Sequence, residues 1–98
     1  MSDLRFEWHA LKAAANLAKR KVSFGEARSV FLDENALLIH DPDHSAHEDR
    51  FLLLGLSQGA RCLVVCHCER QGGEVIRIIS ARKADRREQA EYTQRLKP

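Results

Sequence analysis

The chain lacks the long hydrophobic runs found in membrane proteins and in secretion signals. No apolar run approaches the roughly 20 residues of a membrane-spanning helix, and residues 1–9 lack the apolar stretch of a signal peptide. Internal repeats, low-complexity tracts and an interdomain linker are also missing. We therefore expect a single domain, residues 1–98, that works in the cytoplasm without a membrane partner.

Cysteine and recognisable metal-binding patterns are scarce as well. The three cysteines all lie within residues 62–68, which is a poor disulfide framework, and they lack the Cys-x2-Cys spacing of a zinc knuckle. Segment 41–49 holds His44 and His47 among four carboxylates, but it has no His-x3-His pair and no calcium-loop spacing. We expect buried thiols and a solvated turn, with no metal and no cofactor. A role for His44 or His47 in proton transfer stays open.

The charges are nearly balanced overall but unevenly distributed. The formal net charge is +2, with 44% hydrophobic and 31% charged residues, which is typical of a folded domain rather than a disordered chain. Residues 1–33 carry six basic and four acidic residues, residues 34–49 carry five acidic and no basic ones, and residues 70–98 carry eight basic and four acidic ones. Both ends are therefore basic, and an acidic segment separates them.

Three helices are expected. Apolar residues recur at spacings of three and four near the start, which predicts a helix over residues 9–20 with its stripe in the core. The stripe consists of Trp8, Leu11, Ala15, Ala18 and Val22. Ser23 and Asp85 each precede a glutamate by three residues, the spacing of a capping box. This predicts a short helix from Phe24 and a charged helix from residue 86 to about residue 95.

Short apolar runs bounded by turn residues follow the second helix and predict strands. The runs cover residues 36–40, 51–56, 62–69 and 75–82. The last three are joined by short loops, which favours an antiparallel meander, and residues 4–7 could form a fifth strand. The fold class is therefore α+β, with N-terminal helices packed on a small antiparallel β-sheet of four to five strands and a C-terminal helix.

The last of these strands carries two arginines, Arg77 and Arg82. A charged side chain within an apolar run is costly unless it has a partner, and the planar guanidinium matches phosphate oxygens. Strict alternation puts these two arginines on opposite faces, unless a bulge or the strand's end relaxes it. On the preceding strand, His67 and Glu69 share one face and could form a base and acid pair.

Other interpretations of these residues stay open. Arg77 can pair with Glu69 or another carboxylate, or reach solvent across an open face of the sheet. The run 19–21 can be a solvated helix end. Four basic residues can form a solvated helix entrance rather than contact phosphates: Arg82, Lys83, Arg86 and Arg87.

Several motifs resemble the BrnT toxin family. The most specific is Ile-Ile-Ser-Ala-Arg-Lys-Ala over residues 78–84, followed by Glu88 and Tyr92. The others are Trp8, residues 12–19 with Asn16, Val22-Ser23-Phe24 with Glu26-Ala27, Arg50-Phe51 with Gly55, and Arg77. The resemblance implies a RelE-like fold, metal-independent RNA cleavage and neutralisation by a cognate antitoxin. That antitoxin is typically a DNA-binding, BrnA-like protein, so DNA would be contacted only through it.

The resemblance also marks polar positions: Lys12, Asn16, Lys19, Arg50, Arg77, Arg82, Glu88 and Tyr92. The expected catalytic residues are Arg77, Arg82, His67, Glu69, Lys19 and Arg50. The expected RNA-binding residues are Lys12, Arg20, Lys21, Lys83 and Arg86. Relatives usually read Lys-His-Gly where this chain has Lys19-Arg20-Lys21, so a histidine that could transfer protons is absent. His67 and Glu69 are the first replacements, and His44 is the second.

Two functions are compatible with the resemblance. The first is a ribonuclease toxin of a type II toxin–antitoxin system, whose RNA cleavage inhibits translation and growth. The alternative is a catalytically inactive protein-binding module that acts only in complex with an antitoxin. A transcription factor is disfavoured, because the chain has no recognisable helix-turn-helix pair or ribbon arm.

Overall fold

The computed structural model describes residues 4–41 and 49–96. Its centre is a five-stranded sheet in the order β1-β5-β4-β3-β2. The strands are β1 (Arg5–Glu7), β2 (Leu37–His40), β3 (Arg50–Leu56), β4 (Cys62–Arg70) and β5 (Val75–Lys83). The helices are α1 (Ala10–Arg20), α2 (Phe24–Ser29) and α3 (Arg86–Arg95), with short 3-10 turns η1 (Val30–Leu32) and η3 (Gln71–Gly73). The α+β fold class is confirmed.

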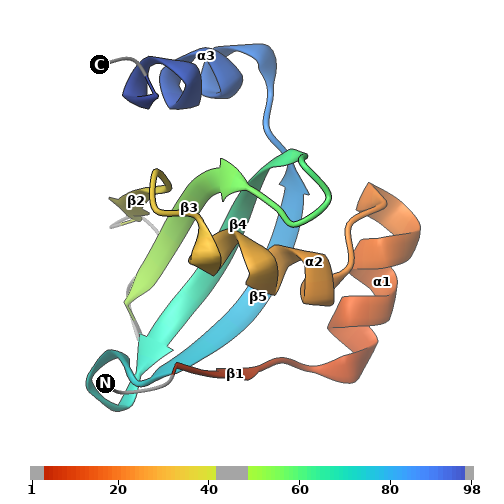
Figure 1. Ribbon diagram of the computed structural model, residues 1–98. Coiled ribbons are helices and arrows are strands. Elements are labelled where there is room, and N and C mark those ends of the chain that lie inside the picture. Colours follow the sequence, from red (N-terminus) through yellow and green to blue (C-terminus); the bar gives the residue numbers. More distant parts are fainter. Residues whose placement is uncertain (1–3, 42–48, 97–98) are drawn as a thin grey trace.

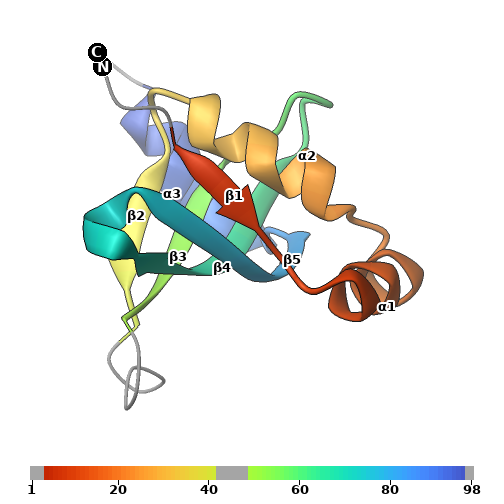
Figure 2. The ribbon, with the colours of Figure 1, turned by 90° about the horizontal axis from the view of Figure 1, so that it is seen from below.

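The helices lie around the sheet in three different places. Helix α2 crosses one face of the sheet, α1 lies beside β5, and α3 lies beyond the strand ends (Figure 1). The view from below shows the same arrangement, with β1 running next to β5 (Figure 2). In the described part of the chain, no helix therefore lies directly across the middle of the face opposite α2, and we call this face the open face.

The sheet is mixed, which corrects the expectation of a purely antiparallel one. Strands β2 to β5 pair antiparallel in chain order, but β1 pairs parallel with β5, with Arg5 opposite Val75 and Glu7 opposite Arg77. A hairpin turn forces antiparallel pairing only between strands that follow one another directly. Strands β1 and β5 are joined by the helices and the whole meander, so no turn sets their relative direction.

The main core lies between α2 and the sheet. Its buried residues are Val22, Phe24, Ala27, Val30, Leu53, Leu63, Val65, Ile76, Ile78 and Ala81. The segment after η1 passes very close to β3, and the absence of a side chain at Gly55 makes this close approach possible. A Cβ at Gly55 would lie 2.9 Å from the Cβ of Ala36 and 3.0 Å from a methyl group of Val30. A larger residue at this position would therefore push η1 away from the sheet.

Helix α1 buries a different side from the one that the apolar stripe predicts. Leu11 is 76% exposed and Trp8 is 37% exposed, whereas Asn16 is 8% exposed. The Asn16 amide nitrogen donates to the carbonyls of Val22 (2.8 Å) and Ala81 (2.9 Å), and its oxygen accepts from the Ala81 N–H (3.1 Å). Hydrogen bonds from a buried amide, rather than leucines, hold α1 against β5.

Both predicted helix starts are confirmed, with one difference in the caps. The Ser23 hydroxyl accepts from the Glu26 N–H, but the Glu26 carboxylate turns away to the guanidinium of Arg61. At α3 the capping box is complete, because Asp85 accepts from the Glu88 N–H (2.8 Å) and Glu88 accepts from the Asp85 N–H (2.9 Å). Helix α3 is thereby fixed directly after β5.

Candidate functional site

A β-bulge in β5 brings Arg77 and Arg82 to the same face of the sheet. Arg77 lies opposite Cys68 and Arg82 lies opposite Val64, with a register shift between them. Ile78 pairs with His67 and Ser80 pairs with Cys66, so Ile79 is the extra residue. The extra residue reverses the alternation beyond it. Both arginines therefore project from the open face, although an odd number of positions separates them.

Three rows of side chains run across this open face. In the first row Arg50, Cys68 and Arg77 are neighbours, and in the third Leu54, Val64 and Arg82 are neighbours. The middle row consists of Leu52, Cys66 and Ser80. At about 3.3 Å per residue along β4, the two arginine rows are about 13 Å apart. The open face thus presents a positive charge at each end of a small, mostly uncharged strip.

The end of α1 adds two more cations beside Arg82. Lys19, Arg20, Arg82 and Lys83 line an open pocket of about 380 Å³. A smaller pocket of about 130 Å³ runs from Arg20 and Arg82 onto the middle row. Helix α1 ends here because Lys21 adopts the left-handed conformation (φ 62°) and its N–H closes the last turn on Leu17. The local concentration of positive charge favours an anionic ligand.

Arg82 is held in place by Glu88. The two guanidinium nitrogens donate to the two carboxylate oxygens at 2.8 and 2.9 Å. This bidentate pair raises the pKa of Arg82, and the same hydrogen bonds hold the pKa of Glu88 below its usual value against the opposing effect of burial. The pair puts an ionised carboxylate directly beside the basic pocket.

Arg77 is half-buried and, among the residues that the structure describes, makes no ion pair. The open possibility of a pair with Glu69 is not realised, because Glu69 lies opposite Ile76 and faces the other side of the sheet. The nearest strand neighbour on β1, Glu7, binds Arg70 instead (2.9 Å). The Arg77 guanidinium is available for a ligand on the open face.

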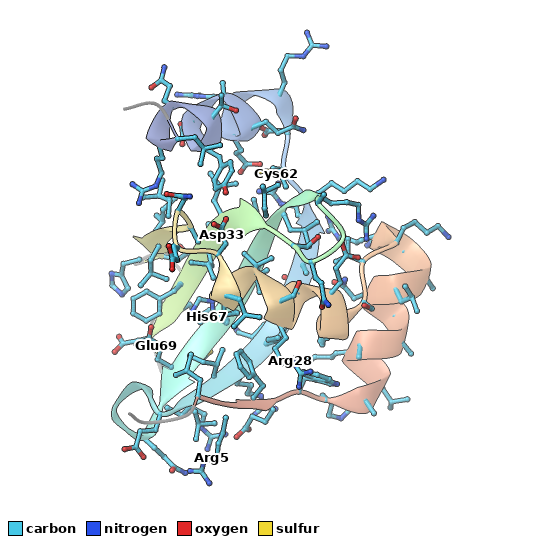
Figure 3. All side chains as sticks on the ribbon, in the orientation of Figure 1. Arg5, Arg28, Asp33, Cys62, His67 and Glu69 are labelled. Carbon is cyan, nitrogen blue, oxygen red and sulfur yellow. The ribbon has the colours of Figure 1, made fainter. Side chains whose placement is uncertain are left out.

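His67 and Glu69 share a face, as expected, but it is the helix-covered one, and this corrects the expectation that they act in one site with Arg77 and Arg82. His67 is completely buried, stacked on Phe51 at 5.8 Å and edge-on to Phe31 at 4.9 Å between ring centroids. Burial lowers the pKa of His67 to about 4, partly opposed by the Val65 carbonyl. Figure 3 shows His67 and Glu69 along β4. The sheet itself separates His67 from Arg77 and Arg82.

The remaining predicted site residues are scattered. Lys12, Lys21 and Arg86 are exposed and do not line the basic pocket, whereas Arg50 belongs to the first row of the open face. His44 and His47 lie outside the described residues. The pattern of residues gave Glu88 no chemical role. Its capping-box spacing predicted only that it lies at the start of α3.

Two further structural results concern other kinds of site. Within residues 4–41 and 49–96, no three histidine, cysteine or acidic side chains lie close enough together to hold a metal ion. In the same residues, no helix is sufficiently long and apolar to cross a membrane.

Comparison with known proteins supplies the family. Residues 8–88 match the model of a family described as "Ribonuclease toxin, BrnT, of type II toxin-antitoxin system". The chain belongs to the BrnT toxin family. The match covers both arginines of the open face, the basic end of α1 and Glu88. A search of the curated proteins found no match.

A solved BrnT structure has a similar fold. The 1.1 Å crystal structure of the Brucella abortus ribonuclease toxin BrnT superposes with a TM-score of 0.61 and 21% sequence identity. The alignment covers 85% of this chain and 99% of that one. The mixed sheet with N-terminal helices and a C-terminal helix is therefore a BrnT-like fold.

Proposed function

We propose that this BrnT-family chain cleaves RNA without a metal ion, in the cytoplasm, and that a cognate BrnA-like, DNA-binding antitoxin neutralises it. The observation that carries the proposal is the shared face of Arg77 and Arg82, together with the pocket that Arg82 lines with Lys19, Arg20 and Lys83. Family membership supports RNA as the substrate and an antitoxin as the partner. DNA is then reached only through the antitoxin.

The spacing of the two rows assigns different tasks to the two arginines. Arg82 holds the phosphate that is cleaved, because it stands beside a carboxylate and two lysines that can move protons. Arg77 and Arg50, about 13 Å away, bind a flanking phosphate of the same strand and fix its direction. Bidentate guanidinium contacts suit both tasks, and they favour the charged transition state at Arg82.

Proton transfer is assigned to Glu88 rather than to His67. The 2′-hydroxyl loses its proton to the Glu88 carboxylate as its oxygen bonds to phosphorus, and the bond from phosphorus to the 5′-oxygen breaks. The ammonium group of Lys19 or Lys83 protonates the leaving 5′-oxygen. The products are a 2′,3′-cyclic phosphate and a 5′-hydroxyl. The lowered pKa of Glu88 keeps its carboxylate ionised at neutral pH, so the group carries no proton of its own, but the contact with Arg82 also makes it a weak base.

The decisive experiment incubates the purified chain with single-stranded RNA in EDTA and identifies the fragment ends. We expect 2′,3′-cyclic phosphate ends, with cleavage falling about 100-fold or more in Arg82→Ala. Arg77→Ala should instead raise the RNA concentration needed for half-maximal cleavage about tenfold. Arg28→Ala removes an equal charge from the opposite side of the molecule, where Arg28 lies over the Phe6 ring, and should leave cleavage unchanged.

Intact RNA in this assay would remove the ribonuclease proposal and favour the inactive binding module. Growth after induction provides the matching test in cells. An active toxin should arrest growth unless its antitoxin is produced as well, and Arg82→Ala should abolish the arrest. Equal growth arrest by the wild type and Arg82→Ala would show that the basic pocket is not the site of cleavage.

A further inference from the structure

Strand β2 forms one edge of the sheet. In the part of the chain that the structure describes, no strand pairs with its outer side. The Asp41 N–H donates to the Arg50 carbonyl on β3 (2.9 Å). Because backbone groups alternate in an antiparallel pair, those of Leu38 and His40 point away from β3. β2 therefore offers donors and acceptors for another strand.

The side chains of β2 are unusually apolar for an exposed edge. Leu38 is 49% exposed on the α2 side, and Ile39 is 39% exposed on the open face. The opposite edge of the sheet differs, because β1 carries Arg5 and Glu7, which bind Gln71 and Arg70. Charged side chains protect a sheet edge from unwanted pairing. Within the described residues, the one titratable side chain of β2 is His40 at its end, which lies 3.9 Å from Asp49, and Leu37, Leu38 and Ile39 are all apolar.

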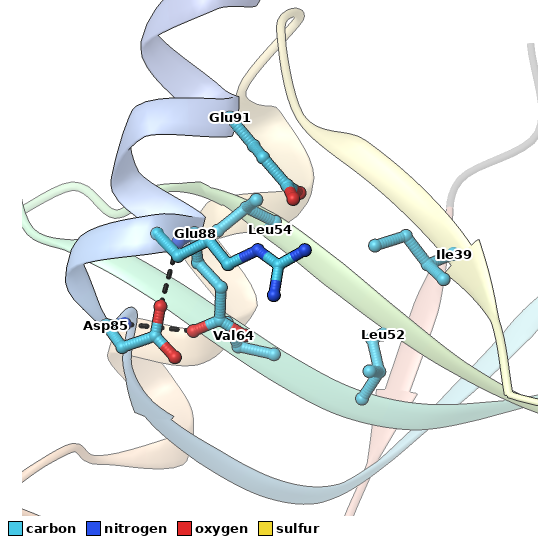
Figure 4. Close-up of a pocket in the computed structure, with 8 residues that line it drawn as sticks. Ile39, Leu52, Leu54, Val64, Asp85, Glu88 and Glu91 are labelled. Carbon is cyan, nitrogen blue, oxygen red and sulfur yellow. Dashed lines mark hydrogen bonds between the residues drawn. The ribbon is translucent and has the colours of Figure 1, made fainter.

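A pocket lies on each side of this edge. On the α2 side, Leu38 borders a pocket of about 250 Å³ whose apolar wall includes Phe31, Ala36 and Leu53. On the open face, Ile39 borders a pocket of about 270 Å³ beneath α3, with Leu52, Leu54 and Val64 as its floor (Figure 4). The side chains of an added strand would point alternately into these two pockets.

The charges around the two pockets select the occupant. The pocket beneath α3 has three carboxylates, from Asp85, Glu88 and Glu91, and one arginine. The pocket on the α2 side is lined by Asp33 and Glu69, with no cation among its described lining residues, although Arg95 is close enough to help lower the pKa of Asp33. A second copy of this chain paired edge to edge would bring these carboxylates toward their equivalents, which is unfavourable. An extended segment with alternating apolar and basic residues fits both the pockets and their charge.

We propose that an extended, apolar and basic segment of the cognate antitoxin binds to β2 as a sixth strand. The inference rests on the proposed function, which supplies the antitoxin. The segment would pair with the backbone of Leu38 and His40 and place its side chains in both pockets. Its basic residues would approach Glu88, so the bound strand reaches the edge of the RNA site.

The backbone of Leu38 gives the sharpest test. Leu38→Pro removes an N–H that points away from β3, so the pairing of β2 with β3 stays intact, and edge strands tolerate such a proline. Leu38→Ala shortens the same side chain but keeps the N–H. With the cognate antitoxin of the proposed function, Leu38→Pro should weaken binding at least about tenfold more than Leu38→Ala. RNA cleavage by the unbound variants should equal that of the wild type.

Hydrogen exchange of the wild-type chain supplies a second measurement that needs no variant. The amides of Leu38 and His40 should exchange fast in the isolated chain and become protected in the complex with the antitoxin. Tight binding by Leu38→Pro, or unchanged exchange of both amides in the complex, would overturn the inference and leave the ribonuclease proposal intact. Failure of the wild type to bind the antitoxin would overturn both the proposed partner and this site.

Discussion

The buried His67 makes the stability of the fold depend on pH. Its side chain is completely buried between Phe31 and Phe51, and its Nε2 atom has no hydrogen-bond partner among the described residues. Burial lowers the pKa of His67 from 6.5 to about 4. Below pH 6.5 His67 binds a proton in the unfolded chain but stays neutral in the folded chain. The folded state therefore loses stability as the pH falls toward 4.

The size of this effect follows from the pKa. Each pH unit between 6.5 and about 4 costs about 1.4 kcal/mol of unfolding free energy. The loss between pH 7 and pH 5 is therefore about 2 kcal/mol, a large part of the stability of a small domain. The carboxyl groups whose pKa values are lowered, those of Glu26, Asp33 and Glu88, lose their contribution mainly below pH 4.5. They add little in this window.

Replacing His67 with an apolar residue should remove this pH dependence. We expect urea unfolding at pH 7 and pH 5 to show about 2 kcal/mol less loss in His67→Phe than in the wild type. His67→Leu is a second apolar variant with a smaller side chain, and it controls for packing. A packing defect lowers the free energy of unfolding equally at both pH values, so it does not change the difference between them. Equal losses in the wild type and both variants would refute the reasoning, since His67 would then titrate alike in the folded and unfolded chain.

Two further predictions concern how the segment after η1 is fixed. Tyr92→Phe removes the hydrogen bond from the Tyr92 hydroxyl to Asp33 (2.6 Å) and leaves a half-buried carboxylate with one donor fewer. We expect the free energy of unfolding to fall by about 1–2 kcal/mol, measured by thermal melting. Gly55→Ala forces a methyl group against Ala36 and Val30 at 2.9–3.0 Å, and we expect a loss of about 1–3 kcal/mol in the same assay. A melting temperature lowered by less than about 4 °C in either variant, the smallest shift expected for a loss of about 1 kcal/mol in a domain of this size, would contradict the prediction for that contact.

Much of the fold can be predicted from local patterns. The four apolar runs form β2 to β5, and each strand begins and ends within about one residue of the expected bounds. Ser23 and Asp85, the first residues of the two capping-box patterns, directly precede α2 and α3. These patterns report interactions between residues close in the chain. The parallel pairing of β1 with β5 could not be predicted in the same way, because no turn or spacing links strands so far apart.

The α1 helix shows where periodicity fails. The stripe of Trp8, Leu11, Ala15, Ala18 and Val22 predicted the buried side, yet Leu11 is exposed and the contact with β5 is made by Asn16. A helix beside the sheet has little apolar surface to cover, so hydrogen bonds to the backbone of Ala81 decide its orientation. Periodicity shows which face of a helix is apolar. It carries no information about hydrogen-bond partners in another helix or strand.

The candidate site depends on a similarly hidden feature. The sequence singles out Arg77 and Arg82 by their charge, but their common face comes from the bulge at Ile79. A bulge leaves no clear sequence signal here, since Ile78 and Ile79 fit a regular strand equally well. A similar gap explains the wrong expectation for His67. Its strand position predicts which residues share its face, but not which face of the sheet the helices cover.

Glu88 connects the local pattern with the proposed chemistry. Its capping box with Asp85 fixes the first turn of α3, and the same carboxylate binds both terminal nitrogens of Arg82. The start of α3 thus determines where the guanidinium at the basic pocket points. Because this helix also covers the pocket beside β2, a strand bound there would contact the element that positions Arg82. Antitoxin binding and RNA binding would then meet at one carboxylate, which makes Glu88 the natural point of coupling between the two proposals.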